Sequence, residues 1–134
     1  MSTGSTDKPM AMKFNDNKAI YLQLADRICD EILLGNCKEE DRIPSVREYA
    51  TEVEVNAGTV VKAYDWLCLQ DIIFTKRGLG FFVSKGARQA IRKMRRQEFM
   101  IDTLPQIAHA MHTLDISMDE LVEKLQALEQ KSQQ

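Results

Sequence analysis

The stretch that decides the predicted fold is residues 43–83, which read IPSVREYATEVEVNAGTVVKAYDWLCLQDIIFTKRGLGFFV. Its first part contains two helix-capping signals, and its second part has two β-rich runs around a glycine-rich turn. The pattern predicts two short helices joined by a turn and followed by a hairpin. In a winged helix-turn-helix, one helix lies in the DNA major groove and a basic β-loop lies beside it. The stretch has that plan.

The first helix of this stretch is expected over about residues 46–53. Ser45 and Glu48 form a capping box: the serine hydroxyl accepts the amide of the third helical residue, and the carboxylate reaches back to the amide of the cap. The box leaves Arg47 in the first turn. Arg47 has an ordinary interpretation as an exposed arginine, but a helix N-terminus beside a serine is well suited to binding a phosphate.

The second helix is expected from a cap at Asn56 to about Gln70. A recognition helix presents its N-terminal residues to base edges, so the residues that read the DNA are expected among Asn56, Gly58, Thr59 and Lys62. Gly58 costs up to about 1 kcal/mol in a helix relative to alanine, and it either permits close approach to DNA or is simply tolerated. Lys62 is a better phosphate contact than a base reader.

The hairpin is expected at residues 72–83. Residues 72–75 and 81–83 are β-branched and aromatic, and the turn between them contains glycines. We expect Lys76 or Arg77 to contact a phosphate or the minor groove from this wing. The glycines also have the plain interpretation of turn residues.

Helical patterns flank the stretch on both sides. Before it, apolar residues recur every four positions from Ile20 to Ile32, on a helix that Asp16 or Asn17 caps and Gly35 ends. After it, a long amphipathic helix is expected to about Thr113, and a last helix begins at a second capping box, Ser117 with Glu120. Pro105 should kink the long helix or mark the first turn of a separate one, with Asp102 or Thr103 as its cap.

Helices of this size cannot bury their apolar stripes alone, so a homodimer through the C-terminal helices is expected. The fold class is therefore mostly α with a small β-wing. Three parts are expected, namely a disordered arm at residues 1–13, a winged helix-turn-helix at 14–84 and a helical dimerisation segment at 85–134.

The charge distribution is more informative than the net charge of -2. Between Lys76 and Gln97 there are eight basic residues and no acid, whereas residues 98–134 carry seven acids against two lysines. The run can be a solvated helix face, but because it begins on the expected wing, phosphate contact is favoured for its first part. No apolar run approaches the roughly 20 residues that span a bilayer, and no secretory signal begins the chain. A cytoplasmic protein without a membrane partner is expected.

Together, these motifs resemble the GntR family of bacterial transcription regulators over about residues 20–84. Residues 43–48 are similar to the family's leucine-proline-serine-x-arginine-glutamate signature, and residues 77–83 are similar to its wing. Residues 56–64 resemble the asparagine-proline-asparagine-threonine-valine-x-lysine-alanine-tyrosine form of the YtrA-type subfamily. The short two-helix tail also resembles that subfamily, where it implies dimerisation.

The resemblance implies a regulator, more often a repressor, that binds a two-fold DNA operator as a homodimer. Carried over residue by residue, it implies DNA contacts at Ser45, Arg47, Asn56, Gly58, Thr59, Lys62, Arg77, Gly78 and Gly80. The chain departs from the family at Ala57 and Val61, where many relatives have arginine, and at Gly58, where the subfamily often has asparagine. The family usually responds to a small effector. About fifty residues follow the wing, which leaves little room for an enclosed pocket of roughly 300 Å³, so a dimer-interface site is the one left open.

Two other classes of function are weaker. For an enzyme, His109 and His112 have a spacing compatible with a metal, but exposed or packing histidines are the ordinary interpretation. The chain has no glycine-rich phosphate loop or nucleophile elbow, and its three cysteines show no CxxC spacing. No catalytic residue, metal or cofactor is expected. The other alternative is an architectural DNA-binding protein, or a winged helix that binds a protein and would not need Arg47 and Arg77 on one face.

Overall fold

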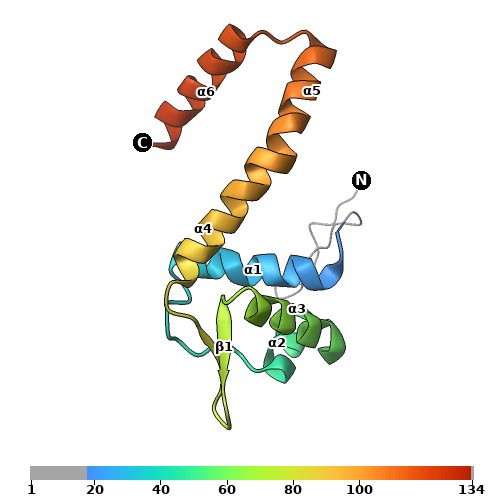
Figure 1. Ribbon diagram of the computed structural model, residues 1–134, viewed down its shortest axis with the longest axis vertical. Coiled ribbons are helices and arrows are strands. Elements are labelled where there is room, and N and C mark those ends of the chain that lie inside the picture. The colour runs from blue at the N-terminus through green and yellow to red at the C-terminus, as the bar shows by residue number, and fades with distance from the viewer. Residues whose placement is uncertain (1–17, 134) are drawn as a thin grey trace. The chain divides into compact units, whose positions relative to one another are not determined.

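The computed structural model describes residues 18–133; the predicted N-terminal arm and the caps expected at Asp16 or Asn17 lie outside the described residues. The elements follow in the order α1 (Ile20–Leu34), α2 (Val46–Val53), α3 (Ala57–Leu69), β1 (Ile73–Lys76), β2 (Gly80–Val83), α4 (Ala87–Glu98), the π-helical η2 (Phe99–Thr103), α5 (Leu104–Leu114) and α6 (Met118–Ser132) (Figure 1). The order confirms a mostly helical fold with a small β-wing. It divides into two compact units, Met1–Lys93 and Met94–Gln134.

The first unit has one core, which α1, α2 and α3 share. Both α1 and α2 pack on α3. Leu24 and Ile32 of α1 and Val60 and Leu67 of α3 are fully buried, as their helical spacing predicts. Ile20 was expected in the same stripe but is 45% exposed, because it is the first residue of α1 and lies at the edge of the core.

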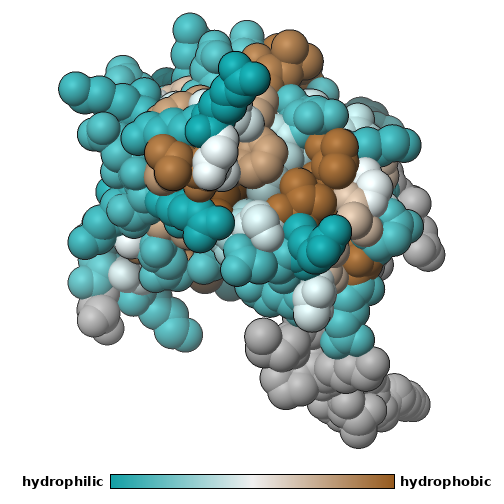
Figure 2. All heavy atoms as spheres, turned by 90° about the horizontal axis from the view of Figure 1, so that it is seen from below, coloured by the Kyte–Doolittle hydropathy of each residue, from teal (hydrophilic) through white to brown (hydrophobic). Residues whose placement is uncertain are grey.

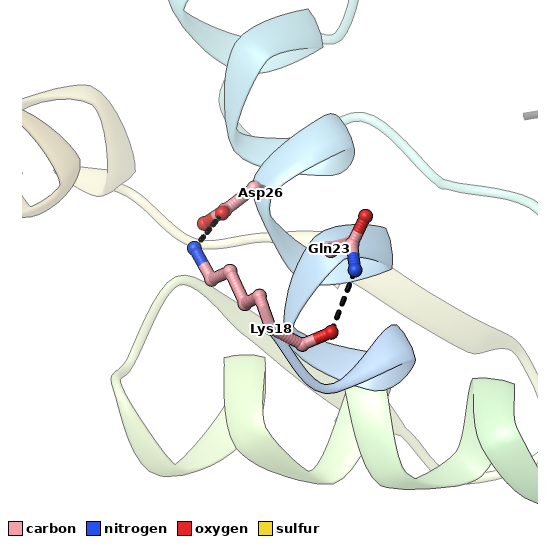
Figure 3. Close-up of polar contacts among 3 residues, drawn as sticks. All are labelled: Lys18, Gln23 and Asp26. Carbon is pink, nitrogen blue, oxygen red and sulfur yellow. Dashed lines mark hydrogen bonds and ion pairs between the residues drawn. The ribbon is translucent and has the colours of Figure 1, made fainter. Parts of the chain in front are cut away.

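The start of α1 differs from the prediction. Its N-cap is Ala19, which makes no side-chain cap hydrogen bond. The Gln23 amide instead donates to the Lys18 carbonyl oxygen at 2.7 Å, and the Lys18 ammonium pairs with the Asp26 carboxylate (Figure 3). The end agrees with the prediction, since Gly35 is the C-cap with a left-handed φ of 87°.

The wing is a two-stranded antiparallel hairpin in which Ile73 pairs with Val83 and Lys76 with Gly80. The segment before α2 adds a short third edge: Arg42 forms a β-bridge with Phe82. The Val83 amide also donates to the Asp41 carbonyl at 2.9 Å. No motif in the sequence indicated this pairing, because backbone pairing of a charged segment leaves no pattern of apolar residues.

Tyr64 of α3 joins these parts. Its side chain is buried, and its hydroxyl donates to the Pro44 carbonyl oxygen at 2.7 Å. Its ring lies edge-on to Phe81 of β2, with ring centroids 4.8 Å apart, and 6.1 Å from the ring of Tyr49 in α2. One side chain thus contacts both neighbouring elements and the segment that leads into α2.

The first unit extends past the wing into α4, because Ala87 and Ile91 are buried in it. The Arg88 guanidinium also donates to the Leu33 carbonyl oxygen at 3.2 Å. The compact unit ends at Lys93, within α4.

The described part of the second unit consists of helices, with a short connection at residues 115–117 between α5 and α6. Thr103 precedes α5 without a side-chain cap bond and has helical backbone angles, so Pro105 does not follow a capped helix start. The chain passes through η2, where the Leu104 amide donates to the Phe99 carbonyl five residues earlier. The wider, π-helical turn of η2 thus lies just before Pro105, which lacks an amide hydrogen and so cannot donate a helical hydrogen bond. At the start of α6, the Ser117 hydroxyl accepts the Glu120 amide at 3.1 Å, which is one of the two bonds of the predicted capping box.

The Tyr64–Pro44 hydrogen bond should contribute measurably to stability. Tyr64→Phe removes the donor and leaves a partly buried carbonyl unpaired, so we expect the free energy of unfolding to fall by about 1 kcal/mol. Urea denaturation followed by circular dichroism measures it. The matched control is Tyr21→Phe on α1, whose hydroxyl makes no hydrogen bond within the described residues. Equal stability of the two variants would show that the bond contributes nothing.

Candidate nucleic-acid interface

The N-terminus of α2 carries the predicted capping box in full. The Ser45 hydroxyl accepts the Glu48 amide at 3.1 Å, and the Glu48 carboxylate accepts the Ser45 amide at 2.8 Å. Hydrogen bonds from the Ser45 amide and from the Ser45 hydroxyl to the carboxylate lower the pKa of Glu48, and the nearby Arg42 charge lowers it further. The Ser45 hydroxyl accepts the Glu48 amide and also acts on the Glu48 carboxylate, so its hydrogen can donate to a phosphate oxygen only in exchange for that carboxylate. Arg47 is exposed in the same turn.

The N-terminus of α3 is capped by Asn56, as the sequence predicts. The Asn56 side-chain oxygen accepts both the Thr59 amide at 2.9 Å and the Thr59 hydroxyl at 3.1 Å. The Asn56 amide group therefore keeps its two hydrogens for other partners, and the Thr59 hydroxyl keeps its lone pairs. A Cβ atom at Gly58 would lie 3.3 Å from the capping oxygen of Asn56, so the glycine relieves crowding at the cap.

Most of the residues expected to contact DNA are exposed. The exposed ones are Arg47, Asn56, Gly58, Lys62, Lys76, Arg77 and Gly78, and the half-buried ones are Ser45, Thr59 and Gly80. All belong to the first compact unit. Figure 2 shows the molecule from the side on which the wing tip lies in Figure 1, and hydrophilic residues cover most of that face, with hydrophobic side chains between them.

Lys76 already has a partner in the wing. Its ammonium lies 4.7 Å from the centroid of the Phe82 ring and 5.9 Å from that of Phe74. Such cation–π contacts contribute about 0.5–1 kcal/mol at exposed sites. A phosphate contact by Lys76 would therefore compete with this stacking, whereas Arg77 and Gly78 lie at the turn itself.

Arg42 is a residue that the sequence reasoning missed, because it closes an otherwise acidic segment. Its Nε donates to the Leu79 carbonyl oxygen at 3.2 Å, across the wing tip. Gly80 has a φ of 109°, and a Cβ atom there would lie 3.1 Å from the Arg42 Nε. Since Arg42 also acts on Glu48, its guanidinium connects the wing tip with the N-terminus of α2.

Other kinds of site find little support in the part of the chain that the structure describes. Within residues 18–133, no group of three or more histidine, cysteine or acidic side chains is arranged to hold a metal ion. Cys29, Cys37 and Cys68 form no disulfide with one another. No helix among the described residues is long and apolar enough to cross a membrane.

Known proteins resemble this chain over most of its length. Residues 20–83 match the family described as "Bacterial regulatory proteins, gntR family". The uncharacterized HTH-type transcriptional regulator YhcF of Bacillus subtilis is 30% identical over 114 residues, or 85% of this chain and 93% of YhcF. The HTH-type transcriptional repressor YtrA of Bacillus subtilis is 33% identical over 104 residues, or 78% of this chain and 79% of YtrA.

A solved structure agrees with these relatives. A crystal structure described as a transcriptional regulator of the GntR family from Bacteroides thetaiotaomicron is 46% identical to this chain and has a TM-score of 0.73. The match covers 85% of this chain and 99% of that one. The similarity therefore includes residues beyond the winged helix-turn-helix.

The two wing glycines should respond differently to alanine. Both have a positive φ, which costs an L-residue roughly 1–2 kcal/mol, but only the Cβ at residue 80 meets Arg42, because Gly78 has nothing within 4 Å. We expect Gly80→Ala to lower the free energy of unfolding more than Gly78→Ala, as measured by urea denaturation. Arg42→Ala should reduce the difference between them. If Gly80→Ala and Gly78→Ala lower the free energy of unfolding equally, both in the parent and in the Arg42→Ala variant, the contact between residue 80 and Arg42 is refuted.

Proposed function

Because this chain belongs to the GntR family of transcriptional regulators and carries the family's DNA-binding domain, we propose that it represses transcription by binding a two-fold operator as a homodimer in the cytoplasm. The observation that carries the proposal is the pair of capped helix N-termini beside a basic wing. The Bacillus relative YtrA is named a repressor, and this supports the sign of regulation. Repression follows when the occupied operator overlaps a promoter.

Base reading is assigned to the N-terminus of α3. The Asn56 amide offers hydrogen-bond donors and the Thr59 hydroxyl offers an acceptor, so the two together suit the mixed edges of the major groove. Gly58 lies between them without a side chain to hold the helix away from the bases. Lys62 follows one turn later, where an exposed ammonium suits a phosphate better than a base.

Phosphate binding is assigned to the N-terminus of α2 and to the wing. The α2 amides, the Ser45 hydroxyl and the Arg47 guanidinium present donors and positive charge at one helix end. Arg77 and Gly78 extend this surface at the wing turn, and Lys76 joins it when its ammonium leaves the Phe82 ring. The half-buried Gly80 acts through its fit against Arg42 and so supports the shape of the wing.

The C-terminal helices are assigned to dimerisation. No residue of α5 or α6 is buried. The exposed apolar residues on the α6 face include Met118 at 66%, Val122 at 43%, Leu125 at 54% and Leu128 at 63%. Their helical spacing forms one stripe, and a second copy that presents the same stripe would remove it from water. A small effector at the interface of two copies completes the proposal.

DNA binding is tested by fluorescence anisotropy against the DNA upstream of the chain's own gene and a scrambled duplex, at two salt concentrations. Arg47→Ala and Arg77→Ala should each weaken binding about tenfold or more, because each removes a charged hydrogen bond. Each should also reduce the steepness with which the logarithm of the affinity falls with the logarithm of the salt concentration, by an amount that corresponds to about one phosphate contact.

The matched control for these variants is Lys124→Ala, which removes an exposed positive charge from α6. Its binding should equal that of the parent. If both arginine variants bind like the parent, the assigned surface is wrong. If the parent binds neither duplex at low salt, the DNA-binding proposal fails and protein interaction takes its place.

The dimer is tested by light scattering after size exclusion. Leu125→Glu places a charge in the α6 stripe, and we expect it to shift the chain from dimer to monomer, because burial of an unpaired carboxylate is unfavourable. Leu69→Glu is the control, since Leu69 is 78% exposed at the end of α3. If the parent is monomeric, or if the Leu125→Glu variant stays dimeric, α6 does not form a dimer interface.

A further inference from the structure

A cavity of about 210 Å³ lies inside the first unit, between α1, α2, α3 and the segment before α2. Arg27, Glu31, Glu52 and Cys37 contribute polar groups to its lining, together with the side chain of Tyr49. Isoleucines and a proline form the rest of the wall with Tyr64. Because every lining residue belongs to the same compact unit, the cavity does not depend on the second unit or on a second copy.

The Tyr49 hydroxyl is the unusual group in this wall. Tyr49 is only 5% exposed, and its hydroxyl has no hydrogen-bond partner among residues 18–133. Its neighbour Tyr64 is equally enclosed, yet the Tyr64 hydroxyl donates to Pro44. A buried hydroxyl without a partner destabilises a fold, and phenylalanine would fill the same space without that cost. A partner that enters the cavity would satisfy this hydroxyl.

The charged side chains around the cavity favour a partner of one charge, positive or negative. Glu31 and Glu52 line it against a single cation, Arg27, whose guanidinium lies 3.9 Å from the Glu52 carboxylate. Burial raises the pKa of Cys37, and Glu31, Asp41 and Glu52 raise it further. Burial likewise raises the pKa of Tyr49 to about 12; Arg27 opposes this shift, and Glu52, Glu31 and Cys37 add to it. The carboxylates thus raise the pKa of the thiol, whereas at the phenol they add to burial and Arg27 is the largest charge effect that opposes them.

We propose that this cavity binds a small organic ammonium ion of single-ring size. The volume suits one ring, because an engineered cavity of about 150 Å³ already holds benzene. The apolar part would contact Ile28 and Ile43. The ammonium would donate to the Tyr49 hydroxyl oxygen and pair with the carboxylates, and tyrosine rings favour a cation near their faces.

Occupancy of the cavity would reach the DNA-binding surface through one segment of chain. Ile43 and Pro44 line the cavity, and the next residue, Ser45, caps α2. A ligand that changes the Tyr64–Pro44 contact therefore changes the position of Ser45 and Arg47. Binding to DNA and binding to the ligand must then alter each other by the same factor. This coupling rests on the proposed function, whereas the binding of the cation does not.

The test uses benzylammonium chloride as the probe, with the full chain, at neutral pH and without DNA. Backbone amide NMR spectra are recorded during a titration, and benzyl alcohol and benzoate serve as neutral and anionic probes of similar shape. We expect saturable shifts for benzylammonium at residues around the cavity, and binding at least about tenfold weaker for the other two, which corresponds to the loss of one charged hydrogen bond. No saturable shift, or equal binding of all three, overturns the proposal.

Variants locate the site and separate it from stability. Tyr49→Phe should be at least as stable as the parent in urea, because its hydroxyl has no partner to lose, but it should bind benzylammonium roughly fivefold more weakly. Glu52→Gln should also weaken binding, and Glu123→Gln on α6 is the control that should not. If Tyr49→Phe and Glu52→Gln both bind like the parent, the cation does not occupy this cavity.

The coupling is read separately, by anisotropy of operator DNA with and without the probe. Benzylammonium should change the DNA affinity of the parent, and Tyr49→Phe should need a roughly fivefold higher probe concentration for the same change. If DNA affinity never responds while the NMR titration saturates, the cavity binds the cation without regulating DNA, and the coupling is wrong. If the chain does not bind DNA at all, the NMR result still decides whether the site exists.

Discussion

The contact that the rest of the DNA-binding unit depends on is that of Tyr64 with its surroundings. α2 has only eight residues and the wing only two strands of four, and neither is stable alone, because short helices and isolated hairpins are marginal in water. Tyr64 supplies buried aromatic area between them and a hydrogen bond to the Pro44 carbonyl. The hydrogen bond is directional, so it fixes where α2 begins as well as adding stability.

Local chemistry explains why the helix caps and glycine turns of this unit were predictable from the sequence. The caps at Ser45 and Asn56 are bonds between residues three apart, so the sequence contains both partners within one turn. The left-handed glycines at the end of α1 and in the wing follow from the same local rules. The Arg42–Leu79 bond joins residues 37 apart, and neither residue type indicates the other. The stacking of Lys76 on Phe82 and the cavity beside Tyr49 likewise depend on tertiary packing. The start of α1 was mispredicted because an alanine stands at its cap.

The two units use apolar residues differently. In the first unit they form a closed core, in which leucines, isoleucines and valines of α1, α3 and the wing are almost fully buried. In the second unit, similar side chains along α5 and α6 remain exposed, although their spacing is that of a packing face. An apolar helical stripe that has no packing partner within its own chain predicts a partner in another chain. α4 belongs to both units, since Ala87 and Ile91 are buried in the first and its last residues begin the second.

The segment before α2 contributes residues both to the proposed DNA-binding surface and to the cavity of the first unit. In extended chain, successive side chains point to opposite sides, and Arg42 is exposed beside the wing whereas Ile43 is buried in the cavity wall. The alternation stops there, because Pro44 lines the cavity beside Ile43, and Ser45 then caps α2. Acidic residues can therefore stand close to the surface proposed to bind phosphate, because Glu48 is held by Ser45 and Glu31 and Glu52 line the cavity. The net charge of the chain hides this separation, and the four residues from Arg42 to Ser45 lie between the two surfaces.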